Sequence, residues 1–177
     1  MLAAARALLL DVGYAGMSID LVAQRAGVNR PAIYRRWPTL AHLVHQAVFG
    51  APRTIAVVET GDFAADLRVL ASSIFLAYAR PEVRAAMAGM LSDLHDHPAL
   101  RASVIDGLEQ QVREQFRDLL ARAIERGDVR PVNADVVLDT IIGSLFHSAI
   151  AVGSPEQGPS PDFLDELLDL LLVGLLH

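Results

Sequence analysis

The fold is decided by residues 18–37, which read SIDLVAQRAGVNRPAIYRRW. Two helices that cross steeply need a small residue at their closest approach, and Ala23 supplies it. Four residues later, Gly27 stands where the chain must turn sharply through a left-handed conformation, which glycine adopts most easily. Six residues beyond that, Ile33 is placed to point from the second helix into a core shared with Ile19, Val22 and Val28. This spacing predicts a helix-turn-helix.

Apolar residues at helical spacing continue on both sides of this stretch, without the period-2 alternation typical of strands. The sequence therefore predicts an all-α fold. Caps such as Ser18, Asn29 and Thr39, together with Gly and Pro breakers, predict helices at 2–12, 19–26, 29–36, 39–50, 63–79, 81–96, 98–126, 133–152 and 162–176. Pro52 and Gly61 place a boundary within 51–62. We therefore expect a three-helix helix-turn-helix domain at 1–50 and a larger helical-bundle domain at 51–177.

Charge is distributed unevenly along the chain. The net charge of the 177 residues is −6, which disfavours a polyanionic partner. Residues 1–50, however, hold five arginines against two aspartates, a net charge of +3, and the remainder carries −9. A basic segment on an acidic chain is compatible with nucleic-acid binding through that segment alone.

Composition excludes several other classes of protein. Hydrophobic residues make up 53% of the chain and charged residues 20%, which favours a folded over a disordered protein. The absence of cysteine excludes disulfides, thiolate nucleophiles and cysteine-ligated metal centres. We find neither a charged leader before an apolar run nor an apolar run of about 18 to 20 residues, so we expect no membrane partner and a cytoplasmic location.

The first 50 residues resemble the TetR family of transcriptional regulators. The resemblance rests on Gly13-Tyr14, Ser18-Ile19, the Ala23/Gly27 pair, residues 34–38 (YRRWP) and Leu43. It implies a ligand-responsive homodimer whose third helix enters the major groove of double-stranded operator DNA, with a C-terminal domain for regulation and dimerisation. We expect a repressor that a small apolar or aromatic effector releases from DNA.

The family pattern can be carried onto individual residues of this chain. It places Asn29, Arg30, Pro31 and Ala32 against base edges, and Ser18, Tyr34, Arg35 and Thr39 against phosphates. Arg30 is the best candidate for specific readout, because a bidentate arginine–guanine pair discriminates by about 1 to 3 kcal/mol. Trp37 is expected to pack the small core. Leu40 departs from the family, which usually has a basic, phosphate-binding residue there, so we expect a shallow dependence of affinity on salt.

Two further groups of residues are candidate sites in the C-terminal part. Apolar and aromatic side chains could line an effector pocket or simply pack the core: Phe75, Tyr78, Met87, Met90, Leu94, Phe116 and Phe146, with His147 as a polar neighbour. Small polar residues along one helix favour a dimer seam over a polar contact to a ligand. The expected dimer residues are Thr140, Ser144 and Ser148, with Phe163, Leu167 and Leu171 of the last helix.

Catalytic and metal sites are less well supported by the sequence. Asp93, His95 and His97 suggest a metal site, but a chelate needs further ligands and Pro98 marks a helix end, where histidine favours the helix dipole. His147 and its neighbouring serines lack an orienting acid, so we expect no enzyme, metal or cofactor. Two alternatives stay open: a helical small-molecule-binding protein or enzyme that retains the fold, and an architectural protein without an effector.

Overall fold

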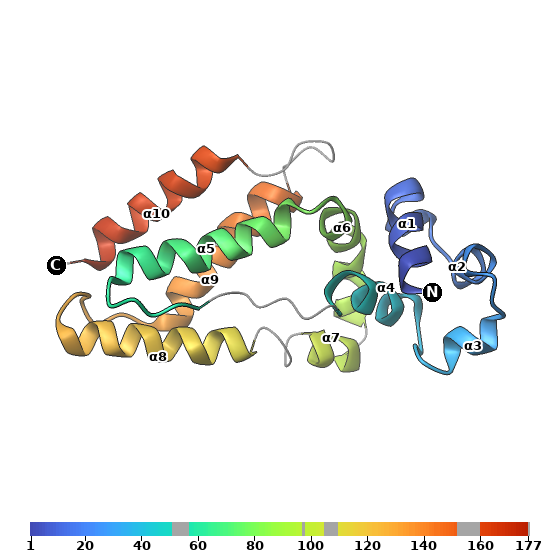
Figure 1. Ribbon diagram of the computed structural model, residues 1–177, viewed down its shortest axis with the longest axis horizontal. Coiled ribbons are helices and arrows are strands. Elements are labelled where there is room, and N and C mark those ends of the chain that lie inside the picture. Colours follow the sequence, from blue (N-terminus) through green and yellow to red (C-terminus); the bar gives the residue numbers. More distant parts are fainter. Residues whose placement is uncertain (51–56, 97, 105–109, 152–159, 177) are drawn as a thin grey trace. The chain divides into compact units, whose positions relative to one another are not determined.

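The computed structural model describes residues 1–50, 57–96, 98–104, 110–151 and 160–176. Within them the secondary structure is helical apart from one isolated antiparallel bridge between Val129 and Leu176. The all-α prediction is therefore confirmed. In chain order the helices of Figure 1 are α1 (Leu2–Val12), the 3-10 turn η1 (Tyr14–Gly16), α2 (Ile19–Ala26), α3 (Arg30–Tyr34), α4 (Leu40–Phe49), α5 (Phe63–Ala79), α6 (Pro81–Asp96), α7 (Pro98–Val104), α8 (Gln110–Arg126), α9 (Ala134–Phe146), the π turn η3 (His147–Ala151) and α10 (Pro161–Leu175).

The N-terminal helices begin at the predicted caps. Side-chain oxygens of Ser18, Asn29 and Thr39 each accept a hydrogen bond from the backbone N–H three residues later, at 3.2, 3.0 and 3.4 Å. Helix α3 is shorter than expected and ends at Tyr34 instead of near Arg36. The chain continues beyond it as a turn, in which the backbone N–H groups of Arg36 and Trp37 both donate to the Ile33 carbonyl, at 2.9 and 3.0 Å.

Two of the longer predicted helices differ from the structure in their extent. The expected helix 98–126 corresponds to α7 and α8, and residues 105–109 between them lie outside the described part. The expected helix 133–152 corresponds to α9, which ends at Phe146, followed by the π turn His147–Ala151. Residue 152 is not among the described residues.

The chain forms two compact units, each built from two segments that are not consecutive in the sequence. The first unit contains residues 1–53 and 80–104, so α6 and α7 pack with α1 to α4. The second unit contains residues 54–79 and 105–177, with α5, α8, α9 and α10. The predicted domains at 1–50 and 51–177 divide the sequence at one point, unlike these two units, and this division stays a proposal.

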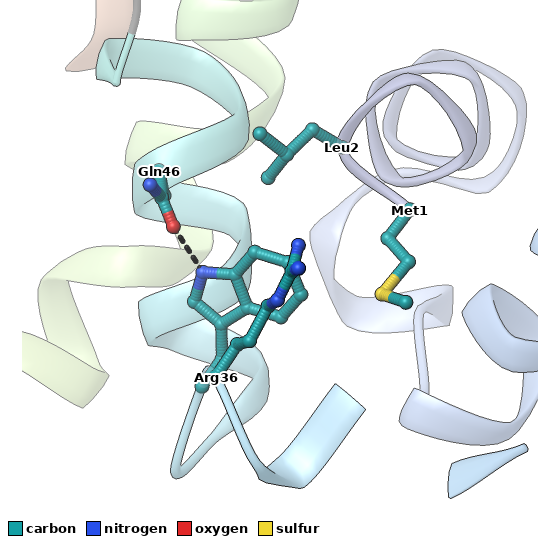
Figure 2. A pocket seen from close by; sticks show the side chains of 5 residues that line it. Met1, Leu2, Arg36 and Gln46 are labelled. Carbon is teal, nitrogen blue, oxygen red and sulfur yellow. Dashed lines mark hydrogen bonds between the residues drawn. The ribbon is translucent and has the colours of Figure 1, made fainter. Parts of the chain in front are cut away.

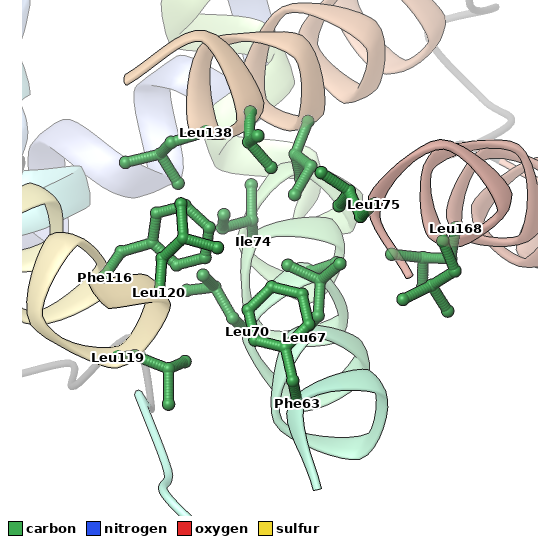
Figure 3. Close-up of a cluster of buried hydrophobic side chains, with 14 of the residues drawn as sticks. Phe63, Leu67, Leu70, Ile74, Phe116, Leu119, Leu120, Leu138, Leu168 and Leu175 are labelled. Carbon is green, nitrogen blue, oxygen red and sulfur yellow. The ribbon is translucent and has the colours of Figure 1, made fainter. Parts of the chain in front are cut away.

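The core of the second unit gathers around α5, which contacts α8, α9 and α10 (Figure 3). Its largest fully buried side chains are Leu67, Leu70, Phe116, Leu119, Leu120, Leu138 and Ile141. The segment 134–151 is long and apolar enough to cross a membrane by length and composition alone. Four residues of α9, Val137, Leu138, Ile141 and Leu145, are however buried in this core, as expected for a core helix of a folded domain.

Candidate nucleic-acid interface

The turn between α2 and α3 has the predicted steric design. Gly27 has φ 64° and ψ 34°, a left-handed conformation, and its neighbour Val28 donates its backbone N–H to the carbonyl of Ala23 at 3.0 Å. Ala23 and Ile33 are buried, Ile33 completely. These three roles are confirmed, and the buried contacts fix the angle at which α3 leaves α2.

Four of the predicted DNA-binding residues come together around one hollow of about 420 Å³. It is lined by Ser18, Ile19, Asp20, Arg30, Tyr34, Pro38, Thr39 and Leu40. Of the predicted set, Ser18, Arg30, Tyr34 and Thr39 belong to this lining. Asn29, Pro31, Ala32 and Arg35 lie on or next to α3 outside it, and all but the half-buried Ala32 are exposed.

The hollow is suited to an anion by its backbone, whereas Arg30 and Asp20, which both line it, pair with each other. Helices α2 and α4 both begin at it, capped by Ser18 and Thr39. A helix N-terminus carries a partial positive charge and unpaired N–H groups, which favour phosphate oxygens. Leu40 also lines the hollow, so the apolar residue noted in the sequence stands at the rim where a cation could have assisted.

The charges of residues 1–50 are arranged in pairs. Asp11 pairs with Arg25, and Asp20 pairs with Arg30. Arg6 donates to the carbonyl of Ala47 at 2.9 Å. In the part of the chain that the structure describes, no ion pair involves Arg35 or Arg36, and both are exposed beside the C-terminal end of α3. Two exposed arginines are thus available to contact phosphate.

A second hollow, of about 660 Å³, lies next to Arg36 and is lined by Met1, Leu2, Arg36, Trp37 and Gln46 (Figure 2). The indole N–H of Trp37 donates to the Gln46 amide oxygen, and Trp37 is only 5% exposed. The packing role predicted for Trp37 is confirmed. Its hydrogen bond ties the connection between α3 and α4 to the second half of α4.

Helix α6 is tied to the helix-turn-helix by contacts that sequence reasoning missed. The Tyr14 hydroxyl donates to the Asp93 carboxylate, and the Tyr14 ring lies against Gly89, where the absence of a side chain makes room for it. Burial raises the pKa of Tyr14, and the hydrogen bond and negative charge of Asp93 raise it further, so the phenol stays protonated and donating. The only signal in the sequence was a glycine inside a helix, which often marks a close approach.

A second tie joins α6 to α4. The Arg80 guanidinium donates to the Val48 carbonyl at 3.4 Å and to the Glu82 carboxylate. Burial by itself raises the pKa of Glu82, but hydrogen bonds from its own backbone N–H and from Arg80 outweigh it and lower the pKa. The ionised Glu82 therefore orients the Arg80 guanidinium, and the hydrogen bonds from Arg80 to the Val48 carbonyl hold the start of α6 to the end of α4.

The structure does not favour a metal site at Asp93 and its neighbours. Asp93 accepts the Tyr14 hydrogen bond, His95 is exposed, and His97 lies outside the described residues. Among the described residues, no three or more potential ligands lie close enough together to hold a metal ion. Asp93 acts in helix packing instead.

The residues predicted for the effector pocket are divided between the two units. Met87, Met90 and Leu94 lie on α6 of the first unit, where Met90 is fully buried. The second unit contains the others, Phe75, Tyr78, Phe116, Phe146 and His147. Among these, Tyr78 and Phe146 make an edge-to-face contact at 6.0 Å between ring centres, Phe116 is buried in the core, and His147 is exposed.

The predicted dimer residues lie on α9, η3 and α10 of the second unit. Thr140 is exposed and donates its hydroxyl to the Val136 carbonyl at 2.7 Å, while Ser144 and Ser148 are half-buried. On α10, Phe163 and Leu171 are half-buried, but Leu167 is only 9% exposed and belongs to the core. The most exposed large apolar side chains of α9 and α10, which sequence reasoning did not select, are Leu170 (74%), Val173 (84%) and Val136 (62%).

Comparison with known proteins identifies the family. Residues 1–47 match the family described as bacterial regulatory proteins, tetR family, and residues 57–171 match the tetracyclin repressor-like C-terminal domain. The uncharacterized HTH-type transcriptional regulator Rv1556 of Mycobacterium tuberculosis is 27% identical, over 99% of this chain and 86% of its own length.

Other relatives agree with this match. The uncharacterized HTH-type transcriptional regulator YdeS of Bacillus subtilis is 27% identical over 86% of this chain and 78% of its own length. The solved structure of the TetR family regulator PfmR from Thermus thermophilus has the same fold, with a TM-score of 0.70, 22% identity, and coverage of 97% of this chain and 96% of its own. With both parts of the chain matched, this protein belongs to the TetR family of HTH-type transcriptional regulators.

Proposed function

We propose that this regulator is a ligand-responsive repressor that binds operator DNA as a homodimer in the cytoplasm. The observation that carries the proposal is the hollow that gathers Ser18, Arg30, Tyr34 and Thr39 at the N-termini of α2 and α4. A backbone phosphate in that hollow would meet two helix N-termini, two hydroxyl caps and a phenol. Arg35 next to it adds a cation.

Base readout is assigned to the exposed start of α3. Phosphate contacts on either side hold the helix in register but carry no sequence information, so discrimination depends on side chains that reach base edges. Arg30 is the first residue of α3, and its side chain is 62% exposed. We assign guanine recognition to Arg30. We assign to Asn29, Pro31 and Ala32 the remaining contacts with the bases, through their shape and polarity.

Dimerisation is assigned to the exposed face of α9 and α10. Leu170 and Val173 are three residues apart, on one face of α10, so together they form an exposed apolar patch, and such patches favour a protein partner. Thr140, Ser144, Ser148, Phe163 and Leu171 would border the same seam. A second copy there would present two α3 helices to two half-sites of a near-palindromic operator.

Response to an effector is assigned to α6. Its side chains Met87, Met90 and Leu94 are apolar, in keeping with an apolar or aromatic ligand, and the same helix carries Gly89 and Asp93, which touch Tyr14. A ligand that prefers one position of α6 therefore acts directly on the helix-turn-helix, as a shift in population between two arrangements. The protein acts by binding and needs no catalytic group or cofactor.

The test is selection of duplexes from a randomised DNA library with the full chain, followed by titration at fixed salt. Wild-type protein should enrich one near-palindromic sequence. Arg30→Ala should lose about tenfold or more of the discrimination between that duplex and one with the contacted guanine replaced. Arg25→Ala removes an equally paired, exposed arginine of α2 that lies away from the reading surface, and it should leave discrimination unchanged. Failure of the wild type to enrich any sequence would overturn the proposal.

A further inference from the structure

Arg30, to which we assign base readout, is held by Asp20, a residue that has no part in the DNA contacts proposed above. Asp20, in the first turn of α2, engages Arg30 through both carboxylate oxygens: Oδ1 with Nε and Oδ2 with Nη2. This is a two-point, fork-on-fork ion pair. Both side chains also line the hollow at the N-termini of α2 and α4.

The geometry of the pair leaves one edge of the guanidinium for another partner. Arginine has two bidentate edges, one formed by Nε and an Nη and the other by the two Nη atoms. Asp20 takes the first edge. The second edge, Nη1 with the remaining proton of Nη2, is the one that can donate to O6 and N7 of guanine.

Stability of the fold gives no adequate reason for the pair. The side chains of Arg30 and Asp20 are 62% and 54% exposed, and exposed ion pairs contribute little to folding because solvent screens them. The pair does, however, remove rotamer freedom from a long arginine side chain before DNA arrives. An arginine that is already ordered loses less entropy on binding its base.

We propose that Asp20 is a positioning residue that orients the Arg30 guanidinium so that its outer edge reads guanine. The inference rests on the proposed function. It also has a second consequence, since a carboxylate beside the phosphate-binding hollow repels the DNA backbone irrespective of sequence. This repulsion lowers the affinity for every duplex equally, so only the orientation of Arg30 by Asp20 changes the discrimination between the correct base and other bases.

The experiment is a double-mutant cycle on the duplex selected by wild-type protein. The four proteins are the wild type, Asp20→Ala, Arg30→Ala and the double variant, each titrated against the selected duplex, its guanine-replaced form and an unrelated duplex. Asp20→Ala should reduce discrimination at that guanine about three- to tenfold, because the Arg30 side chain must then be ordered when it binds the base. It should leave binding to the unrelated duplex unchanged or a few-fold tighter. In the Arg30→Ala background, Asp20→Ala should change discrimination by less than about twofold.

Asp11→Ala is the matched control. Asp11 pairs with Arg25 in the same unit, and its side chain is 53% exposed against 54% for Asp20. Its removal changes the net charge by the same amount. We expect less than about a twofold change in discrimination from it. Circular dichroism and thermal unfolding check that each variant is folded. If Asp20→Ala is not, Asp20→Asn, which keeps an oxygen but loses the charge and one acceptor, takes its place.

Each outcome separates the two proposals. If no duplex is enriched, both fall. If Arg30→Ala loses discrimination and Asp20→Ala keeps it, or if the two losses are additive, the role of Asp20 is overturned and the proposed function stands. Tighter binding of Asp20→Ala to every duplex with unchanged discrimination also overturns it, because Asp20 would then only repel DNA.

Discussion

A methyl group added at Gly89 measures how closely α6 is held to the helix-turn-helix. A Cβ built at Gly89 lies against Cδ1 of Tyr14, 2.8 Å from its Cγ and 2.9 Å from its Cβ. These atoms are at the base of the side chain, so the ring cannot swing away without moving η1. Gly89→Ala must therefore displace Tyr14 and break its hydrogen bond to Asp93.

The free energy of unfolding should fall by about 2 kcal/mol. Overpacking costs about 1 to 3 kcal/mol, and loss of a hydrogen bond to a charged group about 1.5 kcal/mol. The higher helix preference of alanine returns about 1 kcal/mol. For a chain of this size, the melting temperature should drop by about 4 to 8 °C. Urea unfolding followed by circular dichroism gives the free energy, and a thermal scan gives the melting temperature.

The Tyr14→Ala background is the control. In this background, only the close contact between the added methyl group and the Cβ of residue 14 remains. Because the higher helix preference of alanine offsets that contact, Gly89→Ala should lower the free energy of unfolding by less than about 0.5 kcal/mol. Tyr14→Phe keeps the ring and isolates the hydroxyl. An equal cost of Gly89→Ala in the wild-type and Tyr14→Ala backgrounds, or a gain in stability in the wild type, would refute the packing argument.

Two further predictions concern titration and self-association. Burial, and then the charge of His42, lower the pKa of His45, so the folded state favours the neutral imidazole. The contribution of His45 to the stability of the fold is therefore complete above the ordinary pKa of about 6.5. It is lost as the pH falls toward the lowered pKa. Urea unfolding at pH 5 to 8 should show a loss of stability below about pH 6.5 that is absent from His45→Gln; equal slopes would contradict the assignment. Val173→Glu should weaken self-association at least about tenfold in sedimentation experiments, because it would bury an unpaired charge, whereas Val69→Glu, on an exposed site of α5, should not. Equal dimerisation of the wild type and Val173→Glu would remove α10 from the interface.

Local features of the fold were predictable because their physical causes are local. The caps at Ser18, Asn29 and Thr39 and the left-handed Gly27 depend on a few neighbouring residues, and each is where the sequence indicates. Several helices therefore begin and end as predicted. The end of α9 differs, because the change to a π turn at His147 leaves no mark in apolar periodicity.

Contacts between distant residues could not be predicted in the same way. Tyr14 and Asp93 are separated by 79 positions, and the grouping of α6 with α1 to α4 depends on such contacts. The last helix shows a different difficulty. It is apolar around most of its circumference, so periodicity does not decide that Leu167 packs inward while Leu170 and Val173 face outward. The Asp20–Arg30 ion pair could not be predicted for a third reason: it depends on the angle between α2 and α3.

The pairing of charges in the first 50 residues explains how an acidic protein can approach DNA. Its two aspartates are each bound to an arginine, so the excess positive charge is not spread over five arginines. It remains on three arginines: Arg6, which donates to the Ala47 carbonyl, and Arg35 and Arg36, which follow α3 directly and join no ion pair within the described chain. At about 0.1 M salt, charges more than about 10 Å apart are largely screened, so a phosphate next to α3 responds to Arg35 and Arg36 more than to the net charge of −6. In the proposed function, affinity then depends on a short stretch of the chain, and specificity depends on the orientation of the single arginine at the start of α3.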